Sequence, residues 1–492
     1  MTSLSRRNFV RGLAIMPFSV WVARNVRADT PYIRYDIASP AGQEMIAILA
    51  DGFRRMRARN EKDQRSWRWQ WYTHFVNGAT TKSAEISRMF GTTVSDQSTL
   101  ANDMWNTCQA HAGQNVNNFL PWHRMFVFYF EQIIRQVTGR IDFALPYWNY
   151  TSFDPAKRGI VPQQFRMSSD PVFSPLYRPN RTTLANSGQP IHQNQPGDAM
   201  EIATAMAKTS YVSVSGVQGF CRAIDSGIHS RIHVLTGTAT NMGAVPYAGQ
   251  DALFWVHHSN IDRLWASWNR NGGTNPATIS WLNTSFVFVD GTGQRVSARI
   301  GDFLDASLLG YGYDTYVGPD GQEIPPASSA SLLAATAGPT VGTVAERVGD
   351  GASVELSERP VRTSLRLGVG KPLTALDPSG QRHTYLVVKD LHTWSQPEVL
   401  YHLYLTPRGS GPNSKTYIGT INFFDAEFHD HGNGAKGDVL GENFYSFDVT
   451  EVLRRLVRSG AKPGALEVTF VPGGRPTPGA KPLVGSIQLV WQ

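Results

Sequence analysis

The chain has 492 residues, of which 41% are hydrophobic and 17% charged, a composition typical of a globular protein rather than a disordered one. The length exceeds what one ordinary hydrophobic core needs, so two domains are predicted. No run of about 18 or more apolar residues occurs, which argues against membrane insertion. The formal net charge is +7, but residues 1–28 hold five arginines and no acidic residue, which leaves +2 for the remainder. The charge therefore gives little support to a nucleic-acid partner.

Residues 1–28 have the features of a targeting segment. Ser5-Arg-Arg-Asn-Phe-Val10 resembles the twin-arginine export signal, and a modestly apolar stretch follows that ends in small residues at Ala28. The alternative is a disordered basic tail. We expect this segment to engage the twin-arginine export machinery, which transports folded proteins, and the mature protein to be periplasmic or secreted.

Helical patterns dominate residues 29–324. Residues 121–137 begin with Pro121, which suits the first turn of a helix, and place apolar residues at spacings of three and four. Residues 260–268 show the same periodicity. Long loops rich in glycine and proline separate the helices, and strand patterns are weak. The sequence therefore predicts a mainly α domain over residues 29–324.

The pattern changes after a linker predicted at residues 325–351, which is rich in proline, alanine and serine. Beyond it, short segments alternate in polarity or concentrate β-branched and aromatic residues, with turn residues between them. We predict that residues 352–492 form an all-β domain, either an antiparallel sandwich or a small barrel. The expected strands are residues 383–389, 399–405, 417–424, 466–470 and 487–491.

Histidines at metal-ligand spacing occur in two stretches about a hundred residues apart. His229 and His233 are four residues apart, so on a helix both rings leave the same face. His258 lies on the next predicted helix and His123 at the start of another, and facing helices of a bundle commonly supply metal ligands. Neutral imidazole suits copper among the first-row metals. A di-iron carboxylate site would need Glu-x-x-His pairs, which the sequence lacks.

Two long motifs make this array specific: Asn118-Phe-Leu-Pro-Trp-His-Arg124 and Phe254-Trp-Val-His-His-Ser-Asn-Ile-Asp-Arg-Leu-Trp265. Together they resemble the tyrosinase and catechol oxidase (polyphenol oxidase) family of type-3 copper proteins, closely over roughly residues 65–320 and more loosely beyond. The resemblance implies a four-helix-bundle core with two copper ions. It implies that dioxygen oxidises a phenolic substrate, foremost an o-diphenol, with monophenols and o-aminophenols as further candidates, to an o-quinone. The implied ligands are His74, His111 and His123 for the first copper, and His229, His233 and His258 for the second.

The same resemblance assigns supporting roles next to the ligands. Of the pair His257-His258 the family uses the second as ligand, so His257 is expected to support a ligand rather than touch the metal. Asn260 and Asp262 follow on the next turn and are expected to orient histidines or to pair with Arg124.

The sequence departs from the family in the first stretch. Relatives usually have eight residues between the second and third histidines, whereas eleven separate His111 from His123, and Gln114 stands at the regular position. Many relatives also join that histidine to a cysteine by a thioether. Cys108 is three residues before His111 rather than two, which leaves open a crosslink, a buried thiol or a bridge to Cys221.

Residues near the second stretch bear on substrate choice. Asp225 stands four residues before His229, where relatives often hold a water-orienting glutamate, and a carboxylate there could act as general base toward an incoming phenol. Ser230 occupies a position where the stronger monophenol hydroxylases often carry asparagine. Val245 replaces a bulky phenylalanine of plant relatives, which would widen the mouth of the site. We expect oxidation of o-diphenols to outweigh hydroxylation of monophenols.

Residues 352–492 are expected to cover the active-site entrance and to keep the enzyme latent. In plant relatives a similar domain does so by pushing a side chain toward the coppers. Mild detergent or acid is expected to loosen the contact, and cleavage in the exposed linker to release it. The alternative is an independent domain that contributes only stability or solubility.

Two other functions are compatible with the histidine array. An oxygen carrier of the haemocyanin type would use the same six histidines without substrate access. A non-enzymatic secreted module would hold zinc in a histidine cluster. His429-Asp-His431, which lies in a polar, glycine-rich stretch, is expected to be solvated rather than to form a further metal pair.

Overall fold

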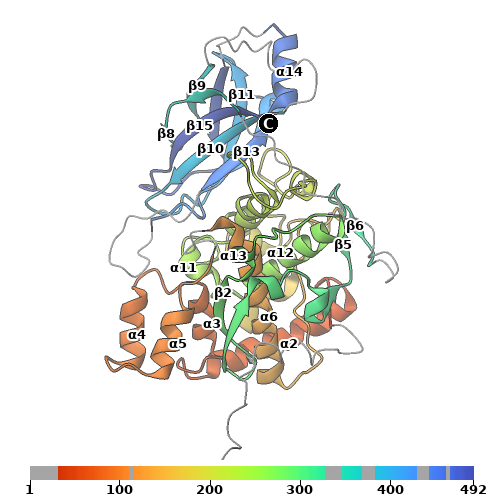
Figure 1. Cartoon of the computed structure of the whole chain (residues 1–492), viewed down its shortest axis with the longest axis vertical. Coiled ribbons are helices and arrows are strands. Elements are labelled where there is room, and N and C mark those ends of the chain that lie inside the picture. Colours follow the sequence, from red (N-terminus) through yellow and green to blue (C-terminus); the bar gives the residue numbers. More distant parts are fainter. Residues whose placement is uncertain (1–31, 110–114, 327–345, 368–382, 429–442, 461–465) are drawn as a thin grey trace, which may run out of the picture.

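The computed structural model describes residues 32–109, 115–326, 346–367, 383–428, 443–460 and 466–492. A helical domain and a C-terminal β domain lie one above the other (Figure 1), which confirms the predicted fold class. None of the described helices is long and apolar enough to cross a membrane. Four predicted features lie outside the described residues: the export signal at 1–28, His111, Gln114 and His429-Asp-His431.

The helical domain contains α2 (Pro40–Ala58), α3 (Trp67–His74), α4 (Lys82–Phe90), α5 (Asp96–Met104), α6 (Phe119–Thr138), α7 (Thr183–Ser187), α8 (Ala203–Met206), α9 (Phe220–Ala223), α10 (Ser230–Thr236), α11 (Val245–Ala248), α12 (Ala252–Arg270) and α13 (Ile279–Leu282). A π-helical segment, Ile224–His229, joins α9 to α10. Three short strand pairs complete the domain: β1 (Tyr32–Arg34) with β4 (Tyr311–Tyr313), β2 (Ser285–Val289) with β3 (Arg295–Arg299), and β5 (Tyr316–Val317) with β6 (Glu323–Ile324).

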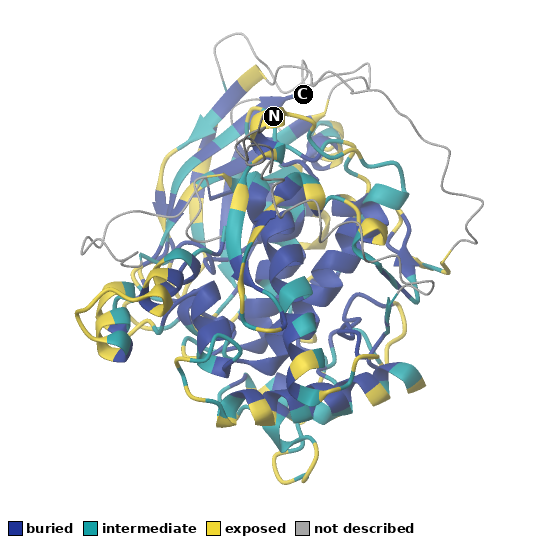
Figure 2. Cartoon of the chain, turned by 60° about the horizontal axis from the view of Figure 1, so that its bottom comes forward, coloured by how far each residue is buried: buried dark blue, intermediate teal, exposed yellow. Residues whose placement is uncertain are grey.

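Helices α6 and α12 pack against each other at the centre of this domain, and α2 covers α6. Helix α12 contains both the periodic segment at residues 260–268 and His258, as predicted, and it begins at Ala252 because Asp251 caps it by accepting a hydrogen bond from the Leu253 amide. Asp251 is itself held by a buried ion pair with Arg181 at 2.7 Å. Residues 252–268 of α12 are all buried, so this helix contributes to the core on every side. Figure 2 shows the buried residues concentrated in the helices at the centre.

One buried carboxylate, Asp262, joins the N-terminal strand to α6 and α12. It accepts hydrogen bonds from Arg34 at 3.0 Å, from Arg124, and from the hydroxyls of Tyr311 and Tyr313 at 2.6 Å each. Burial alone would raise the pKa of Asp262, but Arg124 and Arg34 hold it below its usual value. The carboxylate therefore stays ionised, and the network fixes the register of α6 against α12.

The C-terminal domain is built on one antiparallel sheet with the strand order β12-β11-β14-β9-β7-β15-β10-β13, and β8 also pairs with β15. The end strands β12 and β13 contact each other, so the sheet curls toward a barrel. The strands are β7 (Glu346–Gly351), β8 (Val354–Glu355), β9 (Val361–Leu367), β10 (Thr384–His392), β11 (Tyr401–Pro407), β12 (Tyr417–Ile421), β13 (Phe444–Asp448), β14 (Leu466–Pro472) and β15 (Leu483–Trp491).

Two details of this domain differ from the prediction. The sheet begins at Glu346, within the range predicted as linker, because β7 pairs with β15. A helix, α14 (Thr450–Arg458), lies in the region predicted to contain only strands. Its residues Val452, Leu453 and Leu456 are buried in the core of the domain, so the helix covers part of the sheet.

Candidate metal centre

A first cluster brings three potential ligand atoms of His74, Cys108 and His123 to within 4.8 Å of one another. His74 ends α3, His123 lies near the start of α6, and Cys108 precedes α6 in the chain. The Nδ1–H of His123 donates to the carbonyl of Phe119 over 2.8 Å, which turns Nε2 toward the Cys108 Sγ at 3.4 Å. All three side chains of the cluster are buried, so a metal ion bound here would be shielded from water.

A second cluster contains four histidines whose ligand atoms lie within the same 4.8 Å: His229, His233, His257 and His258. His229 donates through Nδ1 to the carbonyl of Asp225 over 3.0 Å, and His233 donates likewise to Met242 over 2.8 Å. These carbonyls fix the tautomer of each ring and leave its Nε2 available for a metal. Neither Nε2 has a hydrogen-bond partner among the described residues.

The two clusters adjoin each other. The rings of His123 and His258 are stacked 4.3 Å apart with 9° between their planes. The ring of Phe119 lies 4.7 Å from both His123 and His229. Metal ions held by these clusters would therefore be neighbours, an arrangement that suits chemistry shared by two metals.

The imidazoles of His74, His123, His233 and His258 are poor bases. Burial first, and the neighbouring His229 second, lower the pKa of His123 to about 3. Burial and neighbouring histidines also lower the pKa of His74, His233 and His258 well below its usual value. A neutral ring presents a lone pair, so protons do not compete with a metal for these nitrogens near neutral pH.

Comparison with known proteins identifies the family. Residues 64–200 and 176–271 match the common central domain of tyrosinase, and residues 277–319 match the polyphenol oxidase middle domain. The chain belongs to the tyrosinase and polyphenol oxidase family. Both histidine clusters lie within the tyrosinase match, and their donor atoms fit the two copper ions that are the cofactor of this family.

Individual tyrosinases and polyphenol oxidases are similar over part of the chain. The tyrosinase HcTyr1 of Hahella sp. (strain CCB-MM4) is 33% identical over 282 residues, 52% of this chain and 58% of that protein. The chloroplastic polyphenol oxidase II of Ipomoea batatas is 28% identical over 230 residues, 40% of this chain and 38% of that protein. The chain thus matches little more than half, or less, of the length of these relatives.

Two solved plant structures share the whole fold, including the C-terminal domain. Latent aurone synthase (polyphenol oxidase) from natural source has a TM-score of 0.59 at 20% identity, and covers 94% of this chain and 90% of that one. Latent apple tyrosinase has a TM-score of 0.56 at 19% identity, and the match covers 94% of this chain and 97% of that one. The two-domain architecture is therefore that of plant polyphenol oxidases.

The disulfide between Cys108 and Cys221, which the sequence left open, is not formed in this structure. Cys221 is buried, and its Sγ lies 3.5 Å from the carbonyl of Val116. Cys108 lies in the first cluster beside His123. The proposed partner of a thioether, His111, is outside the described residues, so that crosslink stays a prediction.

The expected supporting residues occupy different places. Asp262 pairs with Arg124, one of the two roles predicted for it. The Asn260 side-chain oxygen accepts a hydrogen bond from Arg263 at 3.2 Å, so in the described structure this oxygen faces an arginine rather than a ligand histidine. Val245 is buried at the start of α11, and its backbone hydrogen-bonds to the ring of His74.

Asp225 is buried behind the second cluster. Its Oδ2 accepts a hydrogen bond from Arg222 at 2.7 Å, and its Oδ1 lies 3.2 Å from the His229 Nδ1. Burial would raise the pKa of Asp225, but Arg222 and His229 hold it below its usual value. The hydroxyl of Ser230 donates to the Asp225 carbonyl at 2.7 Å and not to the carboxylate.

The main contact that the sequence did not specify comes from the C-terminal domain. Phe424, in the loop after β12, stacks on His233 with 4.2 Å between ring centroids and 12° between planes. The same ring lies 5.9 Å from His229 and is fully buried. Phe424 ends a segment predicted as a strand, and nothing in its local pattern distinguishes it from a core residue. Only the capping side chain of plant relatives indicated that such a contact would exist.

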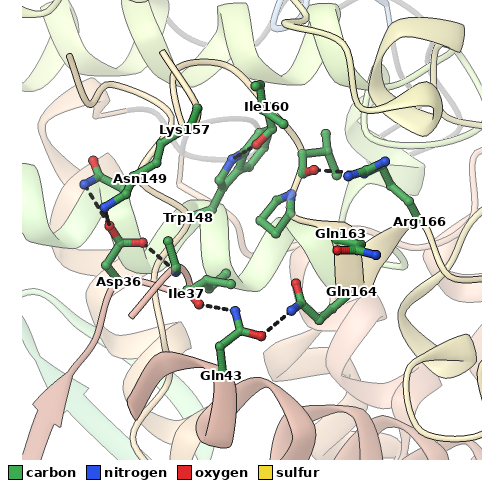
Figure 3. A pocket seen from close by; sticks show the side chains of 14 residues that line it. Asp36, Ile37, Gln43, Trp148, Asn149, Lys157, Ile160, Gln163, Gln164 and Arg166 are labelled. Carbon is green, nitrogen blue, oxygen red and sulfur yellow. Dashed lines mark hydrogen bonds and ion pairs between the residues drawn. The ribbon is translucent and has the colours of Figure 1, made fainter. Parts of the chain in front are cut away.

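A separate cavity of about 370 Å³ is lined by residues outside the two clusters (Figure 3). Its polar groups bind one another. Asp36 pairs with Lys157 at 2.9 Å and accepts a hydrogen bond from Asn149 at 3.2 Å, and the Gln43 and Gln164 amides are in contact. No histidine or cysteine lines this cavity, so it offers none of the chemistry of the two clusters.

Proposed function

We propose that this protein is a copper-dependent oxidase that uses dioxygen to convert o-diphenols to o-quinones. The observation that carries the proposal is the pair of adjoining clusters of buried histidines. Phenolic small molecules are the proposed substrates. The first copper is assigned to His74, His111 and His123, and the second to His229, His233 and His258.

The protein residues hold the ligands and exclude water. Bound copper supplies the redox chemistry and the reaction with dioxygen. The carbonyls of Asp225 and Met242 hold the rings of His229 and His233, so their Nε2 atoms stay directed into the site. The site is buried, and this low-dielectric surrounding strengthens each electrostatic contact within it.

Asp225 is the proposed proton acceptor for an incoming phenol. Its Oδ2 is engaged by Arg222, whereas its Oδ1 has no hydrogen bond of good geometry among the described residues. A carboxylate with a lowered pKa is a weak base, and Ser230 offers no amide to hold a water beside it. These features favour o-diphenols over monophenols, because they make deprotonation of an incoming monophenol less efficient.

The test is an activity panel on the copper-loaded chain, with the metal-free chain as control. Quinone formation and oxygen consumption are measured with a monophenol, an o-diphenol and an o-aminophenol side by side. We expect steady turnover that is fastest with the o-diphenol. An oxygen carrier of the haemocyanin type would bind dioxygen reversibly without turnover. A zinc-binding module would retain zinc and show no absorption band when peroxide is added to copper-treated protein.

We also propose that the C-terminal domain caps this site and keeps the enzyme latent. Phe424 occupies the space beside His233, and hydrogen bonds flank it. Gln218 of the helical domain donates to the Phe444 carbonyl at 3.0 Å and accepts from the Ser446 amide at 3.2 Å. Arg222 donates to the Asn443 side chain at 3.0 Å. The contact is therefore both apolar and polar, and it closes the approach to the second cluster.

Cleavage between residues 327 and 345 tests the cap directly. The released and uncut forms are compared for copper content and for kcat/KM with a catechol. We expect copper to stay bound and kcat/KM to rise. An unchanged kcat/KM, with the C-terminal domain demonstrably removed, would leave that domain with a role in stability only.

Residues 1–28 are the proposed twin-arginine signal, and a periplasmic or secreted location follows from it. The supporting observation is the arginine pair Arg6-Arg7 ahead of an apolar stretch. Replacing both arginines with lysine should keep the protein inside the cell. Export at the normal level in that variant would remove the proposal.

A further inference from the structure

Gln218 connects the C-terminal domain to the segment of the helical domain that carries His229. Its side chain is buried, and both the nitrogen and the oxygen of its amide group are hydrogen-bonded. The nitrogen donates to the Phe444 carbonyl at 3.0 Å and to the Ser226 hydroxyl at 2.6 Å, and the oxygen accepts from the Ser446 amide at 3.2 Å. Phe444 and Ser446 belong to β13, which lies where the two domains meet (Figure 1). One side chain is thus bonded to the C-terminal domain on one side and to Ser226 on the other.

Ser226 lies inside the π-helical segment Ile224–His229, three residues before the proposed ligand His229. Its hydroxyl donates to the Arg222 carbonyl at 2.9 Å and so ties the segment to the preceding turn. Within the segment, Gly227 leaves helical backbone angles, with φ −82° and ψ −112°. A kinked π-helical turn breaks the regular ladder of α-helical hydrogen bonds, and such turns occur frequently at functional sites. The place of His229 therefore depends on side-chain bonds such as those of Ser226.

A second buried side chain makes a similar connection. Arg222 donates to the Asp225 carboxylate at 2.7 Å and to the side-chain oxygen of Asn443 at 3.0 Å. The Asp225 carbonyl in turn accepts from the Nδ1 of His229 at 3.0 Å. Two paths of hydrogen bonds therefore lead from the C-terminal domain to the segment that presents His229.

We propose that Gln218 is a positioning residue for the second metal site, through which docking of the C-terminal domain raises the affinity of that site for its metal. The ligand role of His229 and the identity of the metal as copper rest on the proposed function. In the docked state the Nδ1 of His229 is already bonded and its ring lies in the cluster, so little order has to be gained when the metal binds. Undocking removes two of the three partners of the Gln218 amide. Loss of a partner that orients a ligand from behind lowers metal affinity by roughly 10- to 100-fold.

The coupling between docking and metal binding has to be reciprocal. If docking strengthens metal binding by some factor, metal binding strengthens docking by the same factor. The factor should therefore appear in two independent measurements: the affinity for copper, and the affinity between the two domains after the linker is cut.

The first measurement titrates the metal-free, uncut chain with copper in equilibrium competition with a chelator of known affinity. An equilibrium value does not depend on how easily the chelator reaches the buried site. Gln218→Leu removes the three hydrogen bonds of the amide and keeps a side chain of similar size. We expect this variant to bind one of the two copper ions about tenfold more weakly than wild type, and the other with unchanged affinity.

Gln195→Leu is the matched control for this titration. Gln195 also forms a hydrogen bond across the domain boundary, to His402 at 3.0 Å, but that bond does not involve residues 218–229. The control should therefore bind both copper ions as wild type does. Unchanged copper binding in Gln218→Leu, or equal weakening in Gln218→Leu and Gln195→Leu, would overturn the proposal.

The second measurement is the Kd between the two domains of the wild type after cleavage between residues 327 and 345. We expect this Kd to be about tenfold lower with copper bound than in the metal-free protein, and the difference to shrink in Gln218→Leu. A wild-type Kd that is the same with and without copper would refute the coupling, even if Gln218→Leu does not fold. Catechol turnover is scored separately: its absence would contradict the proposed oxidase function and leave the coupling standing.

Discussion

Replacing Phe424 with alanine should activate the uncut enzyme. The ring is fully buried against His233 in the capped state, and it would be exposed once the C-terminal domain departs. Shortening the Phe424 side chain to alanine therefore destabilises the capped state and leaves the uncapped state unchanged. Removing a buried phenylalanine side chain costs about 3–5 kcal/mol, and 3 kcal/mol corresponds to a shift of about a hundredfold in the equilibrium between capped and uncapped forms.

The assay is the initial rate of quinone formation from an o-diphenol, with each protein uncut and cut in the linker. We expect kcat/KM of uncut Phe424→Ala to rise toward that of the cut wild type, and the two cut forms to be equal. The neighbouring Phe423 supplies the control, because it is buried in the core of the C-terminal domain and packs 5.8 Å from Tyr401. Phe423→Leu should stay latent, whereas Phe424→Leu should be partly active. If uncut Phe424→Ala binds its full copper content and is as inactive as uncut wild type, the Phe424 side chain does not keep the enzyme latent.

Three further predictions concern the metals, the substrate and pH. His233→Ala or His258→Ala should lower the copper content from two ions to about one per chain, measured by metal analysis, and abolish turnover in the quinone assay. Full activity in either variant would contradict the ligand assignment. Ser230→Asn should raise the ratio of monophenol to diphenol rates, and an unchanged ratio would show that this position does not set it. Burial, and next the charge of Asp225, raise the pKa of Asp425 well above its usual value. The proton it binds stabilises the capped state at acid pH, and that contribution is lost as pH rises through the raised pKa. Uncut enzyme should therefore gain activity with rising pH relative to cut enzyme, and Asp425→Asn should flatten the profile.

The last prediction has the opposite sign to the loosening by acid expected from the sequence. Asp425 of the C-terminal domain lies 3.6 Å from Arg222, which is already paired with Asp225. One arginine faces two carboxylates, so a proton on Asp425 relieves the excess of negative charge. This arrangement depends on residues about two hundred positions apart, and no local pattern indicates it.

Much of the histidine arrangement could be predicted because its signals are local. His229 and His233 lie on consecutive helical turns, at the end of the π-helical segment and in α10, and His123 and His258 lie within α6 and α12. In such helical stretches the sequence spacing fixes which side chains share a face. The fold class followed from the change of hydrophobic period between the two domains.

The remainder depends on contacts between distant segments. Phe424 was expected to end a strand. Its side chain packs in the core of the helical domain, whereas that of its neighbour Phe423 packs in the core of the C-terminal domain. Two adjacent phenylalanines in the sequence do not indicate which one faces which core. The position of His257 among the ligand atoms depends on how α12 is rotated against α10. Helix α14 was missed for a different reason: Val452 and Leu456 have helical spacing, but the surrounding strand patterns favoured an all-β interpretation.

The buried Arg34 limits how the chain can be processed. It lies only six residues beyond Ala28, the predicted end of the export signal, yet it is fully buried and pairs with Glu131 at 2.9 Å and with Asp262 at 3.0 Å. Removing one member of a buried ion pair costs about 3–5 kcal/mol, because the remaining charge is left without compensation. A signal peptidase that cut a few residues too late would therefore unsettle the helices that carry His123 and His258.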